Sequence, residues 1–378
     1  MKIVGIVFEA NPFHYGHQYL INNVKKELNP DLIIGITSGY FTMRGEVSIL
    51  TKSNKTEILL NEGIDLVIDL PIYATLNSAD KFAESSVKLL KEAGITDLAF
   101  SIEDGNIDLI KKVYDIEQTS SFNKAFILNQ KIYQSYKKSH YQTLTEFISL
   151  EEANKISEPN MTLALAYYKA TKNYGNIECH LFNRIGDSDS ENELSNYPSG
   201  TAIRNAYYKK EDITSFIPYN IDKLTNVDEV NNNLSLLLKL LTTKDCNEFT
   251  STANVSEGIQ NYLIENIEIH SSYEENINNL CNKRYTKSRI RRTILSMMLE
   301  IPNNLNYDEL PLRVLGFNNK GSNYLKQIKD KIIVNIKQAS HPYLKYDIDA
   351  CKLYSIITNH DYIMDEYRFP IKKGLENE

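Results

Sequence analysis

Short apolar runs alternate with amphipathic segments through the first 210 residues, and this alternation restricts the fold more than any other feature of the sequence. The runs have the length of buried strands, whereas the segments between them place apolar residues at helical spacing, as at Leu20, Val24 and Leu28. Strands are expected at Ile3–Phe8, Leu32–Thr37, Leu66–Leu70, Leu98–Ser101 and Ile177–Ile185, and helices at His17–Leu28, Ser53–Glu62, Ala79–Ala93, Met161–Lys172 and Ser199–Lys209. Such alternation predicts an α/β fold with a parallel, doubly wound sheet that binds ligands at the carboxyl ends of its strands.

The pattern changes after residue 210. Helical segments follow at Asp222–Lys244, Val255–Ile269 and Arg284–Leu299, and beyond Pro311 short strands such as Ile332–Ile336 mix with helices. We therefore expect an α/β domain over residues 1–210 and a mainly helical domain over residues 211–378. Within the first domain, the polar and acidic span Gly186–Asn196 is expected to form a mobile loop.

Composition argues against several classes of protein. Of the 378 residues, 42% are hydrophobic, which fits a globular chain. The sequence has no apolar run of about 18 residues, the length that a transmembrane helix needs. The N-terminus lacks the pattern of a signal peptide. The four cysteines are scattered, which argues against disulfides or a zinc site and is typical of a reducing cytoplasm. A net charge of −7 excludes a uniformly basic coat for nucleic acid but allows a local basic patch.

The first expected strand is followed by Asn11–His17 (NPFHYGH), which places His14 and His17 three residues apart at a predicted helix start. A helix N-terminus offers free N–H groups and the positive end of the helix dipole to an anion. Imidazoles at that place can donate hydrogen bonds to phosphate oxygens. The alternative is that the two histidines only cap the helix or pack against it. The H-x-G-H pattern directly after a strand and Asn-Pro-Phe favours the phosphate site over this alternative. A zinc site would need further ligands, and no nearby residue has the spacing for it.

A second motif, Ser199–Arg204 (SGTAIR), begins another predicted helix. The hydroxyls of Ser199 and Thr201 and the guanidinium of Arg204 can bind phosphates. The alternative is an ordinary helix cap by Ser199 with a solvated Arg204. The motif alone leaves both interpretations open, and its pairing with the histidine motif favours phosphate binding.

Together the two motifs resemble the nucleotidylyltransferase superfamily with the HIGH signature, whose members have a Rossmann-like parallel sheet. His14–His17 matches the H-x-G-H signature, and Ser199-x-Thr201-x-x-Arg204 matches the second phosphate motif. The chain is also similar to a narrower family, the bacterial tRNA(Met) cytidine acetate ligases. The segments that carry this likeness span nearly the whole chain: Gly5–His17, Tyr40–Glu46, Arg284–Arg292 and Arg313–Phe317.

The resemblance implies an enzyme that activates acetate with ATP, giving acetyl-adenylate and pyrophosphate. The acetyl group then passes to the N4 amine of the wobble cytidine in elongator tRNA(Met), without acetyl-CoA. The N-terminal domain would bind ATP and the C-terminal domain would bind the tRNA. Mg²⁺ is expected on the ATP phosphates rather than in a protein cage.

The same resemblance assigns roles to individual residues. His14 and His17 would donate to the α- and β-phosphates, whereas Ser199, Thr201 and Arg204 would hold the β- and γ-phosphates; these five are the expected catalytic residues. Asn11 and Gly16 would shape the turn. The implied ATP-binding residues are Val7, Phe8, Glu9, Ala10, Asn11, Pro12, Phe13, His14, Tyr15, Gly16, His17, Gln18, Tyr19, Leu20, Ser101, Asn160 and Arg184. Position 101 is a departure, because the family usually has glycine where this chain has serine.

A basic run in the second half is the candidate RNA surface. In the helix expected at Arg284–Leu299, Ile290, Ile294 and Met297 form an apolar stripe that faces a core. The cations flank this stripe, and with the family resemblance they are expected to contact tRNA phosphates rather than only solvent. The residues concerned are Arg284, Lys287, Arg289, Arg291 and Arg292.

Three other cations and two other functions remain open. Arg44, Lys52 and Lys55 follow the second strand and are candidates for contact with acetate or tRNA. A small-molecule adenylyltransferase, acting on nicotinamide mononucleotide or phosphopantetheine, would share both motifs but rarely needs so long a helical half. A non-catalytic tRNA-binding protein with a vestigial nucleotide site is disfavoured because both motifs are intact. No oligomeric state follows from the sequence.

Overall fold

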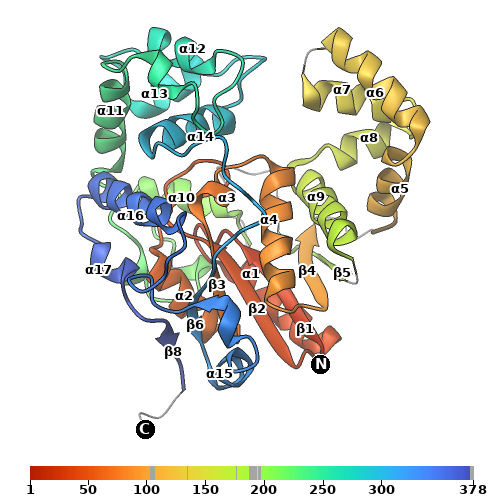
Figure 1. Ribbon diagram of the computed structural model, residues 1–378, viewed down its shortest axis with the longest axis vertical. Coiled ribbons are helices and arrows are strands. Elements are labelled where there is room, and N and C mark those ends of the chain that lie inside the picture. Colours follow the sequence, from red (N-terminus) through yellow and green to blue (C-terminus); the bar gives the residue numbers. More distant parts are fainter. Residues whose placement is uncertain (103–106, 134, 176, 187–193, 195–196, 375–378) are drawn as a thin grey trace.

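The computed structural model describes residues 1–102, 107–133, 135–175, 177–186, 194 and 197–374 (Figure 1). The loop expected at Gly186–Asn196 therefore lies mostly outside the described residues. Among the described residues, no helix is both long and apolar enough to cross a membrane.

A mostly parallel sheet forms the centre of the molecule (Figure 1). Its strands lie in the order β5-β4-β1-β2-β3-β6-β7, and β8 pairs with β6. β1 to β5 are parallel to one another, and β6 runs antiparallel to β3. The strands are β1 Ile3–Phe8, β2 Leu32–Ser38, β3 Leu66–Leu70, β4 Asp97–Ile102, β5 Glu178–Asn183, β6 Leu312–Phe317, β7 Ile332–Ile333 and β8 Ile371–Lys372. The predicted α/β class and the five N-terminal strands are confirmed.

Helices cover both faces of the sheet. Ile6 and Phe8 of β1 pack in one apolar cluster with residues of α1, α2 and α10, such as Ile21 and Ile203. The opposite face packs against α4 and α9 in the larger cluster, which includes Ile34. The helices are α1 Tyr15–Asn23, followed by a π-helical turn Val24–Leu28, α2 Lys52–Asn61, α3 Ile72–Thr75, α4 Ala79–Glu92, α9 Pro159–Tyr174 and α10 Gly200–Tyr208. This two-sided cover leaves the carboxyl ends of the strands for a ligand.

Two further groups of helices stand at the same end of the molecule, on opposite sides of the view (Figure 1). One group lies between β4 and α9: α5 Ile107–Glu117, α6 Ser120–Tyr133, α7 Tyr136–Leu144 and α8 Leu150–Ile156. The other follows α10 after 3₁₀ turns at Thr214–Phe216 and Ile221–Lys223: α11 Val230–Leu241, a 3₁₀ turn Cys246–Phe249, α12 Ile259–Asn266, α13 Tyr273–Leu280 and α14 Lys287–Met298.

Three expected elements in the second half are shorter than predicted, for local reasons. The helix expected from Asp222 begins only at Val230, because the Asn226 side chain accepts the Asp228 N–H in a turn. The helix expected from Val255 begins at Ile259, after three residues in left-handed conformations, Asn254, Glu257 and Gly258. The strand expected at Ile332–Ile336 ends at Ile333, and the Asn335 side chain then accepts the Lys337 N–H.

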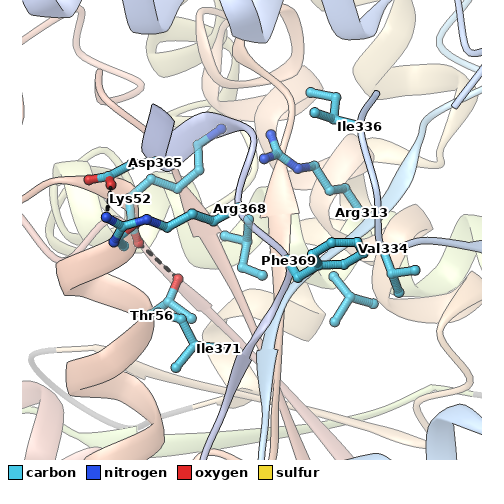
Figure 2. Close-up of a pocket in the computed structure, with 12 residues that line it drawn as sticks. Lys52, Thr56, Arg313, Val334, Ile336, Asp365, Arg368, Phe369 and Ile371 are labelled. Carbon is cyan, nitrogen blue, oxygen red and sulfur yellow. Dashed lines mark hydrogen bonds and ion pairs between the residues drawn. The ribbon is translucent and has the colours of Figure 1, made fainter. Parts of the chain in front are cut away.

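The C-terminal part of the chain returns to the sheet. It contains α15 Asn319–Leu325, a 3₁₀ turn Lys329–Lys331, α16 Leu344–Thr358 and α17 Ile363–Glu366, and it contributes β6, β7 and β8. A cavity of about 50 Å³ lies where these segments meet α2, with Val334, Ile336 and Phe369 among its lining side chains (Figure 2). The division at residue 210 thus stays a prediction, while the sheet itself draws strands from both halves.

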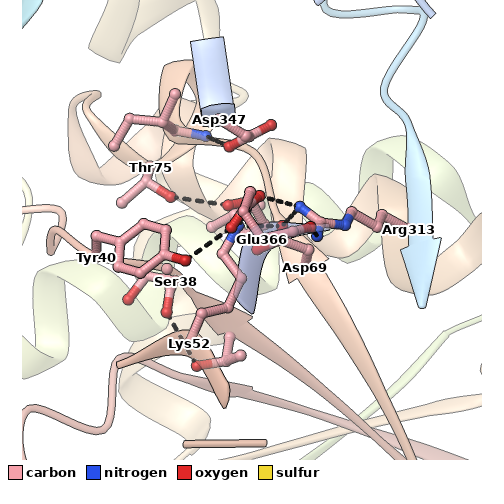
Figure 3. Close-up of polar contacts among 12 residues, drawn as sticks. Ser38, Tyr40, Lys52, Asp69, Thr75, Arg313, Asp347 and Glu366 are labelled. Atoms are coloured by element: carbon pink, nitrogen blue, oxygen red, sulfur yellow. Dashed lines mark hydrogen bonds and ion pairs between the residues drawn. The ribbon is translucent and has the colours of Figure 1, made fainter. Parts of the chain in front are cut away.

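A buried ionic network connects these C-terminal elements with α2 and β3 (Figure 3). The Lys52 Nζ atom lies 2.7 Å from an Asp69 carboxylate oxygen and 2.9 Å from one of Glu366. The Arg313 guanidinium contacts the same two carboxylates. All four side chains are at most 8% exposed, so the two positive and two negative charges compensate each other out of water.

Candidate functional site

The loop after β1 places both predicted histidines at the carboxyl edge of the sheet. β1 ends at Phe8 and α1 begins at Tyr15, with His14 as its N-cap residue. The His14 Nδ1 atom accepts the Gly16 N–H at 3.0 Å, and the His17 Nδ1 atom accepts the His14 N–H at 3.2 Å. The two rings therefore form a reciprocal capping box, so their capping role is real.

This capping also determines what the two rings can offer to a ligand. A neutral imidazole whose Nδ1 accepts a hydrogen bond carries its proton on Nε2. Burial, followed by neighbouring positive charges that include Arg184, lowers the pKa of His17 to about 3 and that of His14 well below its usual value. Both rings are thus neutral near pH 7, and each has one Nε2–H group that can donate to a phosphate oxygen.

The remainder of the predicted ATP loop is held rigidly. The Asn11 amide donates to the Val47 carbonyl at 3.3 Å and its oxygen accepts the Ile49 N–H at 2.9 Å, so the loop is tied to the segment after β2. A Cβ atom at Gly16 would lie 2.7 Å from the His14 ring, which explains why only glycine fits between the histidines. Asn11 and Gly16 therefore shape the turn in the expected way.

The second motif packs directly on this loop. Ser199 caps α10, because its hydroxyl accepts the Ala202 N–H at 3.1 Å. The Arg204 guanidinium donates to the Asn11 carbonyl and, at 3.2 Å, to the Thr201 hydroxyl. Its side chain is only 12% exposed, so the alternative of a solvated arginine is wrong. The structure thus brings the two sequence motifs into contact.

The three outlying ATP-site residues lie around the same edge. Ser101 pairs with Phe182 in the β4–β5 ladder, near the carboxyl end of β4. Arg184 directly follows β5, and its N–H donates to the Ile102 carbonyl at 2.8 Å. Asn160 is the second residue of α9. Because the Arg184 charge acts on both histidines, Arg184 is the outlying residue with the clearest connection to the loop.

A partly buried acid, Glu9, and a buried base, Lys55, lie beyond the histidines. The Glu9 carboxylate accepts the Met43 N–H, and the Lys55 ammonium donates to the Ser38 and Gly39 carbonyls at 3.1 and 2.9 Å. Burial raises the pKa of Glu9 and lowers the pKa of Lys55 to about 7. Lys52, also a candidate from sequence, instead belongs to the buried ionic network. Lys55 is therefore the lysine that lies next to the loop with His14 and His17.

The predicted RNA-binding cations do not share one environment. Arg284 and Lys287 are exposed, and Arg289 is partly exposed beside Glu257. Arg291 instead pairs with Glu274 at 2.8 Å, and its side chain is 14% exposed. Arg292 donates to the Met43 carbonyl at 3.3 Å, and burial lowers its pKa to about 10. The last two arginines hold α14 against the rest of the protein, a role the sequence did not indicate.

Sequence reasoning missed Glu46, although its segment was noted. Its carboxylate lies 2.7 Å from Arg204 and 3.6 Å from Arg291, so it stands between the second motif and α14. Arg44, which the sequence singled out in the same loop, is exposed. No local signal in the sequence indicated this role, because both partners are more than 150 residues away along the chain.

The described residues contain a single group of three side chains suited to a metal ion, namely Asp97, Glu178 and His180. These residues lie where β4 and β5 begin, at the amino ends of the strands, whereas the histidines lie at the carboxyl ends. They cannot serve a nucleotide at the histidine loop. The expectation that Mg²⁺ would bind to ATP phosphates rather than to a set of protein ligands stays a prediction.

Comparison with known proteins agrees with this geometry. The family model described as HIGH Nucleotidyl Transferase matches residues 1–367. A tRNA(Met) cytidine acetate ligase of Clostridium perfringens is 32% identical over 98% of this chain and 100% of its own length. The enzyme of the same name from Staphylococcus aureus is 32% identical over 95% of this chain and 96% of its own length.

Two solved structures have the same fold. Thermotoga maritima TmcAL bound with alpha-thio ATP superposes with a TM-score of 0.86 at 26% sequence identity, covering 98% of this chain and 99% of that one. Its apo form superposes with a TM-score of 0.87 at 25% identity and the same coverage.

Proposed function

Because this chain belongs to the tRNA(Met) cytidine acetate ligase family of HIGH nucleotidyl transferases, we propose that it activates acetate with ATP and acetylates the wobble cytidine of elongator tRNA(Met). The observation that carries the proposal is the contact between the two motifs, where Arg204 of α10 donates to the Asn11 carbonyl of the histidine loop. That contact supports a single site for one triphosphate.

The first step joins acetate to the nucleotide. A carboxylate oxygen of acetate attacks the α-phosphorus, a P–O bond forms, and the bond to pyrophosphate breaks. The protein's task is to position the reactants and stabilise the charge that develops on phosphate oxygens. The Nε2–H groups of His14 and His17 suit the α- and β-phosphates, and Ser199, Thr201 and Arg204 suit the β- and γ-phosphates. We infer that Val7–Leu20, Ser101, Asn160 and Arg184 surround the rest of the ATP.

In the second step the N4 amine of the cytidine attacks the acetyl carbonyl carbon. An N–C bond forms, the C–O bond between the acetyl group and AMP breaks, and the amine nitrogen loses one proton as AMP leaves. We propose that residues 1–210 supply the ATP site and residues 211–378 bind the tRNA. Arg284 and Lys287 are the cations best suited to tRNA phosphates, because they are exposed on α14 or just before it. The site of action would be the cytoplasm, where tRNA is used.

One experiment tests the whole proposal. The purified chain is incubated with ATP, Mg²⁺, isotopically labelled acetate and elongator tRNA(Met), and the tRNA nucleosides are analysed by mass spectrometry. Labelled N4-acetylcytidine at the wobble position is expected, and a tRNA with uridine there is the control. Unlabelled tRNA, together with ATP–pyrophosphate exchange that responds to nicotinamide mononucleotide or phosphopantetheine instead of acetate, would replace this function by small-molecule adenylylation.

A further inference from the structure

A polar pocket of about 320 Å³ lies between α10, the loop after β2, and the helices α11, α13 and α14. This volume is within the usual range for sites of small ligands. We name it the Glu46 pocket, after one of its lining residues. Its other polar and aromatic lining residues used below are Thr201, Arg204, Tyr208, Tyr273 and Arg291. Because Thr201 and Arg204 also belong to the second motif, the pocket adjoins the proposed phosphate site.

Glu46 has one carboxylate oxygen available in this pocket. Its Oε2 atom accepts a hydrogen bond from Arg204 at 2.7 Å. Its Oε1 atom lies 3.6 Å from Arg291 Nη1, which is too far for a hydrogen bond, and it accepts none from the other described residues. The pocket therefore presents a hydrogen-bond acceptor beside a guanidinium, which is a donor.

Arg291 is itself held in place by ion pairing. Its Nη2 atom contacts both oxygens of Glu274, at 2.8 and 3.1 Å, whereas Nη1 points toward Glu46. A Cβ atom at Gly45 would lie 2.7 Å from the Arg291 Cβ, so the loop and α14 approach very closely here. The acceptor and the donor are thus fixed relative to each other by packing.

Two tyrosine rings complete the lining. Tyr208 comes from the last turn of α10, and Tyr273 is the first residue of α13. Burial raises the pKa of Tyr208 to about 12, so its hydroxyl stays neutral. Aromatic rings beside hydrogen-bonding groups are the surroundings in which proteins receive an unstacked nucleobase.

The arrangement of acceptor and donor matches one pyrimidine. Cytosine has an amine donor at N4 beside the acceptors N3 and O2, whereas uracil has an acceptor, O4, where cytosine has the amine. A carboxylate accepts from the cytosine amine but repels O4 of uracil. A guanidinium next to it donates to the ring acceptors.

We propose that the Glu46 pocket binds the substrate cytosine of the RNA, with Glu46 accepting a hydrogen bond from the N4 amine and Arg291 donating to the acceptor side of the base. This inference rests on the proposed function, because it takes the acetyl acceptor to be a cytidine. It assigns Glu46 as a specificity-determining residue, distinct from the groups that bind ATP.

The test compares two RNA hairpins with the anticodon stem and loop of elongator tRNA(Met), one with C and one with U at the wobble position. Their affinities for the full chain are measured by fluorescence anisotropy at one fixed salt concentration. The wild-type protein should bind the C hairpin on the order of tenfold more tightly than the U hairpin. In Glu46→Gln the amide can donate to O4 of uracil, so the ratio should fall to about one.

Glu257→Gln is the matched control. Glu257 also pairs with two arginines, Arg284 and Arg289, but it does not line the pocket. This variant should keep the wild-type preference for C. A ratio that is unchanged in Glu46→Gln, or a wild-type protein that binds both hairpins equally, would overturn the inference.

Failure of the proposed function can be distinguished from failure of this inference. Acetate-dependent ATP–pyrophosphate exchange without RNA reports only on adenylate formation. Its absence from the wild-type protein would contradict the proposed function, whereas the C-to-U ratio would still report on the pocket. Glu46→Gln keeps an oxygen that can accept from Arg204, so its circular dichroism spectrum and melting temperature should match those of Glu257→Gln.

Discussion

At the scale of single residues, the two histidines act as neutral donors because the backbone occupies their Nδ1 atoms. Replacing His17 with alanine removes one Nε2–H donor from the proposed phosphate site. We expect acetate-dependent ATP–pyrophosphate exchange to fall on the order of a hundredfold, the usual cost of losing one such donor. Initial rates at saturating ATP measure this effect.

Asn22→Ala is the control for His17→Ala. Asn22 is exposed on the same helix, α1, so its loss should leave the exchange rate and the melting temperature unchanged. The loss of the His17 cap should lower stability by only about 1 kcal/mol. Exchange at the wild-type rate in His17→Ala would show that His17 only caps the helix.

The low pKa values of the histidines also make stability depend on pH. Because the folded protein keeps both rings neutral, the unfolded chain binds more protons below about pH 6.5. The free energy of unfolding therefore rises with pH, and this contribution is complete above pH 6.5 and lost as the pH falls below it. Between pH 7.5 and 5.5, His17 should account for about 1.4 kcal/mol of lost stability, and His14 should add to the loss in the same direction.

Urea unfolding at these two pH values measures the loss. In His17→Ala one of the two contributions is absent, so stability should fall by about 1.4 kcal/mol less than in the wild-type protein. Equal losses in the two proteins would mean that His17 is protonated in the folded state.

The sequence predicted some residues of the site and not others, for a reason that concerns distance along the chain. His14 and His17 act within one loop, so their spacing alone indicates a phosphate site. Glu46 acquires its role from Arg204 and Arg291, which approach it only after folding. Nothing near Glu46 in sequence distinguishes it from the exposed Arg44.

At the scale of secondary structure, the five predicted strands follow from local sequence, whereas the three strands that were not assigned to the sheet depend on pairing with distant parts of the chain. β1 to β4 are short, buried, mostly apolar runs, which the sequence shows directly, whereas β5 is a largely unburied strand that was expected because it continues the alternation of strands and helices. β6 is paired antiparallel to β3, a strand more than 240 residues earlier, and no local pattern reports such a pairing. The C-terminal part of the chain joins the sheet, and only the charged side chains that it buries, Arg313 and Glu366, mark this contact.

Those buried charges lead to a prediction about the C-terminal elements. Although burial alone would raise it, the contacts with Lys52 and Arg313 lower the pKa of Glu366 to about 2, so the carboxyl group is ionised throughout the usual pH range. Glu366→Gln leaves the two cations with Asp69 as their remaining direct carboxylate partner. We expect the free energy of unfolding to fall by about 3 kcal/mol, because a buried charge is then uncompensated.

Urea unfolding at pH 7 measures this change, and Asp349→Asn is the control. Asp349 pairs with Lys352 on the surface of α16, where both side chains are close to half exposed, so its loss should cost less than about 1 kcal/mol. A similar small cost in Glu366→Gln would mean that the network does not hold the C-terminal segment to the sheet.

At the scale of the whole molecule, the loop after β2 connects the carboxyl ends of the strands with the α11–α14 group of helices. The loop after β2 contacts the histidine loop through Asn11, the second motif through Arg204, and α14 through Arg291 and Arg292. Arg284, just before α14, and Lys287, its first residue, are exposed to solvent. The nucleotide and the RNA would therefore meet across α14, whose inward arginines position it and whose outward cations remain for phosphates.

This division of the cations predicts how salt affects RNA binding. Each phosphate contact releases counterions, so the logarithm of the association constant falls linearly with the logarithm of the salt concentration. In the double variant Arg284→Gln/Lys287→Gln the slope should become less steep by about 2, or about 1 for each lost contact. Affinities for elongator tRNA(Met) at several KCl concentrations measure it.

Lys326→Gln is the control. It removes an exposed cation next to α15, at the opposite end of the molecule from α14, and should leave the slope unchanged (Figure 1). If the double variant keeps the wild-type slope, the tRNA backbone does not lie along α14, and another surface of the protein binds the RNA.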